Sequence, residues 1–162
     1  VAPGNSPGKI TVLNSFSMQG TGVYKAEILD KDHYDQIVAQ SVQLSNGGSS
    51  PKLELVYLPG GTIKKGDTFT IINNNGSAPV QGTFNGLPEG AEFAVDGATF
   101  KISYVGGDGN DVVLTAQNDS TGPKAPNTGG ENVAVNLAGT IVGVASAAIL
   151  LFMAKRKSFG KK

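Results

Sequence analysis

The chain has 162 residues, of which 13 are basic, 13 are acidic and none is cysteine. The lack of cysteine excludes disulfides and thiol chemistry, and with a single histidine it also excludes a Cys/His zinc knuckle. The part before residue 132 is acidic and has no basic patch with interleaved aromatic residues, which argues against nucleic acid as a partner.

The first 117 residues are predicted to form one β-rich module. Tyr24, Ala26 and Ile28 alternate with charged residues, and the same period of two recurs over 99–104, as in strands with one buried face. Further strands are expected at 10–13, 37–44, 52–58, 67–73, 91–95 and 111–116. Asp96-Gly97 lies between two strand-like runs and indicates a type I′ hairpin. No run before residue 133 has a useful helical period, so the predicted class is all-β.

The glycine-rich run Gly-Gly-Asp-Gly-Asn-Asp at 106–111 matches one copy of a calcium-binding repeat. Such repeats bind calcium when they are stacked, because consecutive turns share each ion. A single copy therefore favours an ordinary β-turn, with Asp108 and Asp111 as weak metal candidates. We expect no cofactor, with calcium as the one alternative.

The only histidine, His33, is flanked by Asp30, Asp32 and Asp35. Spacing on a loop does not define a metal site, and a solvated charged turn is the favoured interpretation. No serine lies in a nucleophile motif, and no catalytic constellation is recognised. The module is therefore not expected to be an enzyme by itself.

Several sequence segments of the module resemble the ends of β-helical passenger domains of bacterial autotransporters and related surface proteins. These segments lie at 3–12 (which begins Pro-Gly-Asn-Ser-Pro-Gly), 66–72, 82–90 and 102–115. The resemblance covers most of residues 1–116 and implies the last rungs and C-terminal cap of a right-handed β-solenoid. The regular spacing of turn signals also fits a β-sandwich, which stays the alternative. Autotransporters continue into β-barrel strands, whereas this chain continues into one apolar span.

A linker and a membrane span follow the module. Residues 118–130 hold no large apolar side chain and are rich in Pro, Gly, Ser, Thr and Asn, as in a solvated linker. Residues 133–154 contain no charge. As a helix they would be about 33 Å long, against about 30 Å for the hydrocarbon core of a bilayer. We therefore predict a single transmembrane helix over 131–154, with its apolar part at 133–154.

Charge predicts the orientation of this span. The basic tail 155–162, which begins Lys155-Arg156-Lys157, carries a net charge of +5 and no acidic residue. All 13 acidic residues and the eight other basic ones precede the span, which gives −5 on that side. The positive-inside rule places the tail in the cytoplasm and residues 1–132 outside.

The order of motif, apolar span and basic tail resembles the cell-wall sorting signal of Gram-positive surface proteins. The motif is Ala125-Pro126-Asn127-Thr128-Gly129, which matches the family's Leu-Pro-x-Thr-Gly except for Ala125 in place of Leu. The resemblance implies that a sortase thiolate attacks the Thr128 carbonyl, cuts between Thr128 and Gly129, and passes the chain to an amine of the peptidoglycan precursor.

These features predict a surface-displayed protein, anchored in the membrane and then attached to the cell wall. The first ten residues contain no basic and apolar export signal, so we expect the chain to be the C-terminal part of a longer protein or a precursor that has already been trimmed. The favoured function is structural or adhesive. The alternative is the membrane-proximal end of a surface-anchored glycan-active enzyme whose catalytic rungs lie upstream. No feature of the sequence identifies the external ligand.

Overall fold

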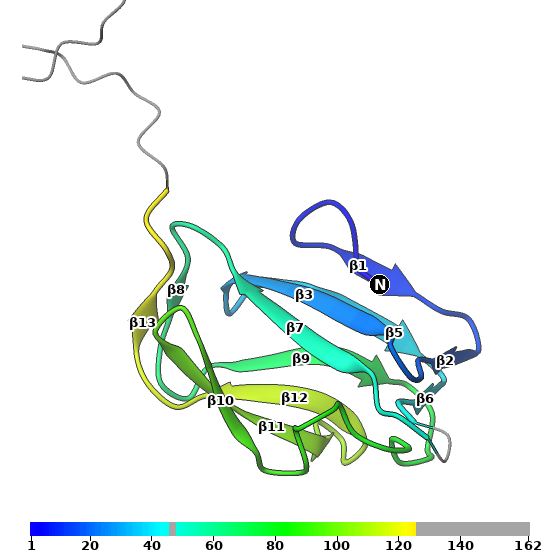
Figure 1. The fold of residues 1–162 in the computed structure, drawn as a ribbon. Helices are drawn as coiled ribbons and strands as arrows, with labels where there is room; N and C mark the ends of the chain where they lie inside the picture. Colours follow the sequence, from blue (N-terminus) through cyan, green and yellow to red (C-terminus); the bar gives the residue numbers. More distant parts are fainter. Residues whose placement is uncertain (46–47, 126–162) are drawn as a thin grey trace, which may run out of the picture. The chain divides into compact units, whose positions relative to one another are not determined.

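The computed structural model describes residues 1–45 and 48–125, and within these ranges every regular element is a β-strand (Figure 1). The strands in chain order are β1 (Lys9–Thr11), β2 (Ser15–Ser17), β3 (Val23–Asp30), β4 (His33–Tyr34), β5 (Gln36–Ala39), β6 (Ser41–Gln43), β7 (Lys52–Tyr57), β8 (Thr62–Ile63), β9 (Thr68–Asn74), β10 (Glu92–Val95), β11 (Ala98–Gly106), β12 (Asp111–Ala116) and β13 (Ser120–Thr121). The predicted all-β class is confirmed.

Alternation of side chains explains the longest strands. In β3 the apolar residues Tyr24, Ala26 and Ile28 are fully buried, whereas the lysine and glutamate between them face outward. The β10–β11 hairpin closes through Asp96 and Gly97, whose φ angles are 47° and 83°. Two consecutive residues with positive φ are what a type I′ turn requires, so this predicted hairpin is confirmed.

The first half of the chain traverses the same three sheets twice. The first pass (9–30) comprises β1, β2 and β3, and the second pass (36–57) comprises β5, β6 and β7. Each strand of the first pass pairs in parallel with its equivalent in the second, 27, 26 and 29 residues further along the chain. Side chains at matching positions therefore lie side by side, as in the row Ile10, Ile37 and Ile72 that continues into β9.

The second half of the chain switches to antiparallel pairing. The six-stranded sheet has the order β1-β5-β9-β12-β11-β10, in which β9, β12, β11 and β10 are joined by antiparallel ladders. Register shifts occur between Val112 and Val113 and between Ser103 and Gly106. The sheet is thus parallel at its β1 end and antiparallel at its β10 end.

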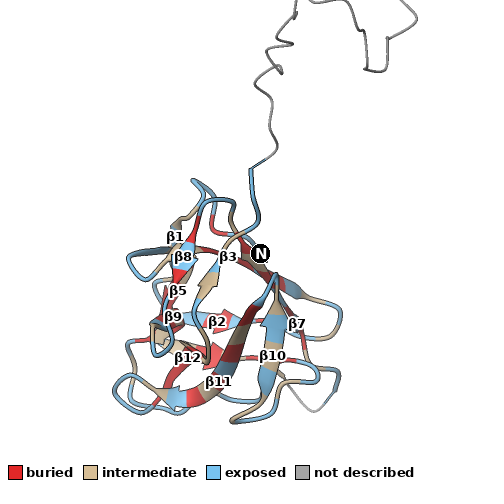
Figure 2. Cartoon of the chain, turned by 90° about the vertical axis from the view of Figure 1, so that its left-hand side faces the viewer, coloured by how far each residue is buried: buried red, intermediate tan, exposed pale blue. Residues whose placement is uncertain are grey.

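One apolar core is enclosed by these sheets, and buried segments follow their inner faces (Figure 2). Its aromatic centre is Phe69 on β9, which meets the rings of Tyr34 and Phe100 nearly edge-on. Edge-to-face contacts of this kind add about 0.5–1.5 kcal/mol to the stabilisation from area burial. The core lies between strands from both passes and from the antiparallel half, so it joins them into one folding unit.

Candidate functional site

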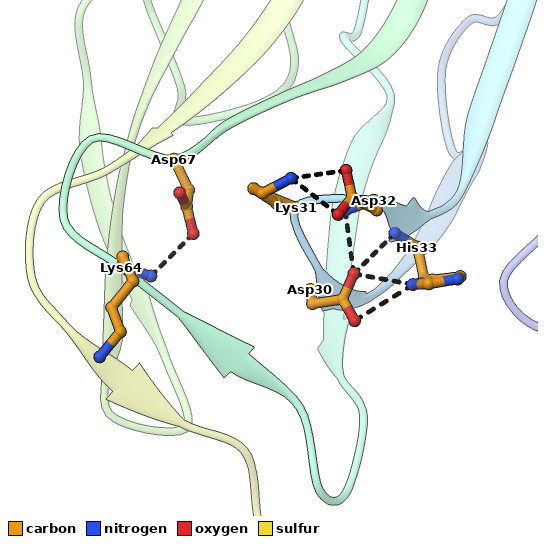
Figure 3. A network of polar contacts seen from close by, with 6 residues as sticks. All are labelled: Asp30, Lys31, Asp32, His33, Lys64 and Asp67. Atoms are coloured by element: carbon orange, nitrogen blue, oxygen red, sulfur yellow. Dashed lines mark hydrogen bonds and ion pairs between the residues drawn. The ribbon is translucent and has the colours of Figure 1, made fainter.

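The charged turn around His33 is held together by Asp30 (Figure 3). The Asp30 carboxylate accepts hydrogen bonds from the backbone N–H groups of Asp32 and His33, each at 2.9 Å, and contacts Nδ1 of His33 at 2.9 Å. The bond from the Asp32 N–H, followed by the one from the His33 side chain, lowers the pKa of Asp30. These bonds close the connection between β3 and β4, so Asp30 acts as a turn-forming residue.

A hollow of about 320 Å³ lies beside this turn, lined by Pro7, Gly8, Lys9, Asp32, His33, Tyr34 and Gln36. It brings the imidazole of His33 near a lysine and a tyrosine. No serine, threonine or cysteine lines the hollow.

Asp35, by contrast, faces inward and is only 1% exposed. Its Oδ1 accepts a hydrogen bond from the Gly8 N–H at 2.6 Å, and its Oδ2 accepts one from the Glu27 N–H at 3.0 Å. Its own N–H donates to the Glu27 carbonyl at 2.8 Å. Asp35 therefore joins β3 to the segment that leads into β1, and its role is structural. The sequence placed it beside His33 but offered no signal that its carboxylate is buried.

The pKa of Asp35 predicts a pH dependence of stability. Burial raises this pKa, while the hydrogen bonds from Gly8 and Glu27 act in the opposite direction. The folded state thus holds the proton more tightly than the unfolded chain. The stabilisation that comes from protonated Asp35 is complete below the pKa of an aspartate in the unfolded chain, about 3.9. It is lost as the pH rises through the pKa of Asp35 in the folded state. We expect the stability of the wild type relative to Asp35→Asn to fall as the pH rises above the unfolded-state pKa and through the raised pKa of folded Asp35.

This expectation is checked by urea unfolding of both proteins at a series of pH values. Tyrosine fluorescence reports on the module alone, because all four tyrosines lie within residues 24–104 and the chain has no tryptophan. Parallel stability curves for the two proteins would contradict the raised pKa.

The glycine-rich turn after β11 is the second polar cluster. Asp111 is buried, and its Oδ1 accepts a hydrogen bond from the backbone N–H of Asn74 at 2.8 Å. Burial raises its pKa, and the nearby charge of Asp108 adds to this effect. Gly107 has a φ of 58°, and a Cβ at this position would collide with the Asp111 carboxylate. The glycine and the aspartate of the motif thus serve a tight turn that holds β12 against β9.

Asn110 extends this turn to the neighbouring loop. Its Nδ2 donates to the carbonyl of Gly76 at 2.5 Å, while its buried Oδ1 has no hydrogen-bond partner among the described residues. Residues 1–45 and 48–125 contain no group of three or more His, Cys, Asp or Glu side chains that could hold a metal ion. Calcium binding at Asp108 and Asp111 therefore rests on the sequence motif alone.

The start of the predicted linker is paired with the module. β13 pairs with β8, and the hydroxyl of Tyr57 donates to the carbonyl of Ser120 at 2.9 Å. Gly122 donates to the carbonyl of Gly61 at 2.8 Å, and the Pro123 carbonyl accepts from Gly60 at 3.3 Å. Backbone pairing thus extends to Pro123.

Only the first residue of the predicted sorting motif is described. Ala125 is exposed and belongs to no strand. Pro126, Asn127, Thr128 and Gly129, the span 131–154 and the basic residues Lys155, Arg156 and Lys157 lie outside the described residues.

In the described part of the chain, no helix is long and apolar enough to cross a membrane.

Comparison of the chain with family models, with curated proteins and with solved structures finds no match.

Proposed function

We propose that this chain is the C-terminal, wall-anchoring end of a surface-displayed structural or adhesive protein. The observation that carries the proposal is the order of three signals: the Pro-x-Thr-Gly motif at 126–129, the uncharged stretch 133–154, and the basic tail 155–162. The split of charge, −5 before the stretch and +5 after it, supports an external module and a cytoplasmic tail.

The proposed partner of the motif is a sortase. Its thiolate attacks the Thr128 carbonyl, the bond to Gly129 breaks, and an amine of the peptidoglycan precursor then displaces the thiol. Pro126 fixes its own φ and keeps Ala125 extended, while Gly129 allows close approach to the bond that is cut. After Pro123 only five residues lead to Thr128, which gives a reach of at most about 17 Å. The module would thus be held close to the wall.

The external module is, in this proposal, the C-terminal end of a right-handed β-solenoid. The parallel pairing of β1 with β5, β2 with β6 and β3 with β7 at intervals of 26–29 residues supports it. The mixed six-stranded sheet, which is antiparallel from β9 to β10, also fits the alternative, a β-sandwich-like arrangement. Right-handedness follows from the strong preference of parallel crossovers for that hand. The antiparallel strands β10–β12 would form the cap.

The sorting reaction is tested by replacing Thr128. In Thr128→Ala we expect the wall-linked fraction to disappear and the protein to remain in the membrane fraction, because the sortase family reads this threonine. Cell fractionation followed by immunoblotting measures the distribution. Asn127→Ala is the matched control: it changes the neighbouring residue, which the family does not read, and should still be attached to the wall. Equal distribution of all three proteins would overturn the proposal.

A further inference from the structure

Val1 lies beside β3 in the position of a strand residue, although it precedes the first pass (9–30). The nitrogen of Val1 donates to the Val23 carbonyl at 2.6 Å, and the Val1 carbonyl accepts from the Lys25 N–H at 2.9 Å. In a parallel ladder, one residue bonds to both neighbours of the residue opposite it. Val1 is therefore paired in parallel with Tyr24 at the edge of β3 that faces away from β7. At the opposite edge of β3, Tyr24 pairs with Leu53 of β7.

The strands β1 and β2 present outward backbone groups. Within the described residues each pairs on one side only, with β5 and β6 respectively. The Gly8 carbonyl and the Val12 N–H point towards β5, so the N–H of Lys9 and the carbonyl of Thr11 point away from it. Ser15 and Ser17 of β2 occupy the same outward positions. Such unpaired edges are templates for a further strand.

Burial decreases towards this edge. Ile37 and Ile72 are fully buried, but Ile10, at the β1 end of the same row, is only half-buried. Large apolar side chains are also exposed in the first pass and ahead of it: Leu13 is 83% exposed and Val1 is 53% exposed. A layer stacked on β1 and β2 would remove this apolar surface from water.

The opposite end of the same sheet is protected. It ends in β10, a short strand of an antiparallel hairpin, on which Glu92 is exposed and stands opposite Lys101. Charges on a short edge strand oppose further pairing. The two ends of the six-stranded sheet therefore differ: the β10 end is closed, and the β1 end is open.

We propose that the open edge of β1 and β2 receives one further pass of β-strands, delivered by the polypeptide that leads into Val1. Its strands run parallel to β1 and β2, and its third strand begins beside the start of β3, where Val1 pairs with Tyr24. The occupant carries apolar residues at the positions equivalent to Ile10 and Phe16. This inference rests on the proposed solenoid end and is independent of the sorting motif.

The test adds the missing pass to the 162-residue chain in detergent micelles. Because Val1 pairs with Tyr24, a copy of residues 9–23 fused directly before Val1 supplies equivalents of β1 and β2 in register. We expect hydrogen exchange at the amides of Lys9, Thr11, Ser15 and Ser17 to slow by tenfold or more, and the melting temperature of the module to rise. An extension with the same residues in scrambled order should change neither the exchange rates of these amides nor the melting temperature.

Thr11→Pro provides the matched variant, because it removes an N–H that faces away from β5, a substitution that edge strands tolerate. In the extended chain, this substitution should abolish the slower exchange and the rise in melting temperature. The unextended chain with the same substitution should still fold, as its tyrosine fluorescence would show. Equal exchange with the copied and scrambled extensions would overturn the proposal. Edge protection that appears in the unextended chain and grows with protein concentration would also overturn it, because the occupant would then be a second copy. Wall attachment through Thr128 is scored separately by fractionation, so either proposal can fail alone.

Discussion

Replacing Phe69 with alanine is expected to lower the free energy of unfolding by about 3–5 kcal/mol. Phe69 is fully buried on β9, the strand that joins the parallel and the antiparallel parts of the six-stranded sheet. Its ring lies 5.4 Å from that of Tyr34 and 5.9 Å from that of Phe100. Removing it leaves a cavity between β9, β11 and the segment that carries Tyr34. A domain of this size has about 5–15 kcal/mol of stability, so the loss is a large share.

Urea unfolding followed by tyrosine fluorescence measures this loss. Val105→Ala is the matched control, because Val105 is a large apolar residue that is 62% exposed. Its truncation should change the stability by less than about 0.5 kcal/mol. Similar effects for the two variants would mean that Phe69 is not at the centre of the core.

Replacing Asp35 with alanine is expected to destabilise the module by about 2–5 kcal/mol. The variant leaves two partly buried N–H groups, those of Gly8 and Glu27, without their acceptor. Each unsatisfied group costs about 1–3 kcal/mol. The effect should be concentrated at the start of the chain, because the Gly8 bond ties the segment that enters β1 to Asp35. Hydrogen exchange at the Gly8 and Glu27 amides, measured with the unfolding curve, locates it.

Asp32→Ala controls for the loss of an aspartate from the same turn region. Asp32 is exposed and paired with Lys31 at the surface, where solvent screens the pair and its contribution to stability is small. A loss in Asp35→Ala no larger than in Asp32→Ala would contradict the structural role of Asp35.

Strands with a clear alternation of side chains were predictable from the sequence. The runs around Tyr24 and Phe100 and the Asp96-Gly97 hairpin are present where they were expected. The strand expected over 37–44 is divided at Gln40, whose N–H bonds to the Asn14 carbonyl and marks a corner between two sheets. The segment contains neither proline nor glycine, so no turn signal in the sequence reveals this corner. The strands β2, β4, β8 and β13 are too short for alternation to show.

Pairing partners could not be predicted in the same way. Alternation indicates which side of a strand is buried, but not that β1 lies beside β5 or that β9 lies beside β12. The polar clusters could not be predicted either, because their hydrogen bonds join strands whose pairing the sequence does not reveal. The partner of Asp111 is the N–H of Asn74, 37 residues away in sequence, and the partner of Tyr57 is the carbonyl of Ser120. Side chains that bond backbone groups of distant strands leave no local motif.

We propose that the chain is cut after Thr128 and joined to the cell wall. Mass spectrometry of muralytic digests of cells that make the protein tests it most directly. We predict a C-terminal peptide that ends at Thr128 and carries a fragment of the peptidoglycan cross-bridge on its carboxyl group. Recovery of the protein only from membranes, with the sequence intact through Lys162, would contradict the account and would leave a permanent membrane anchor in its place.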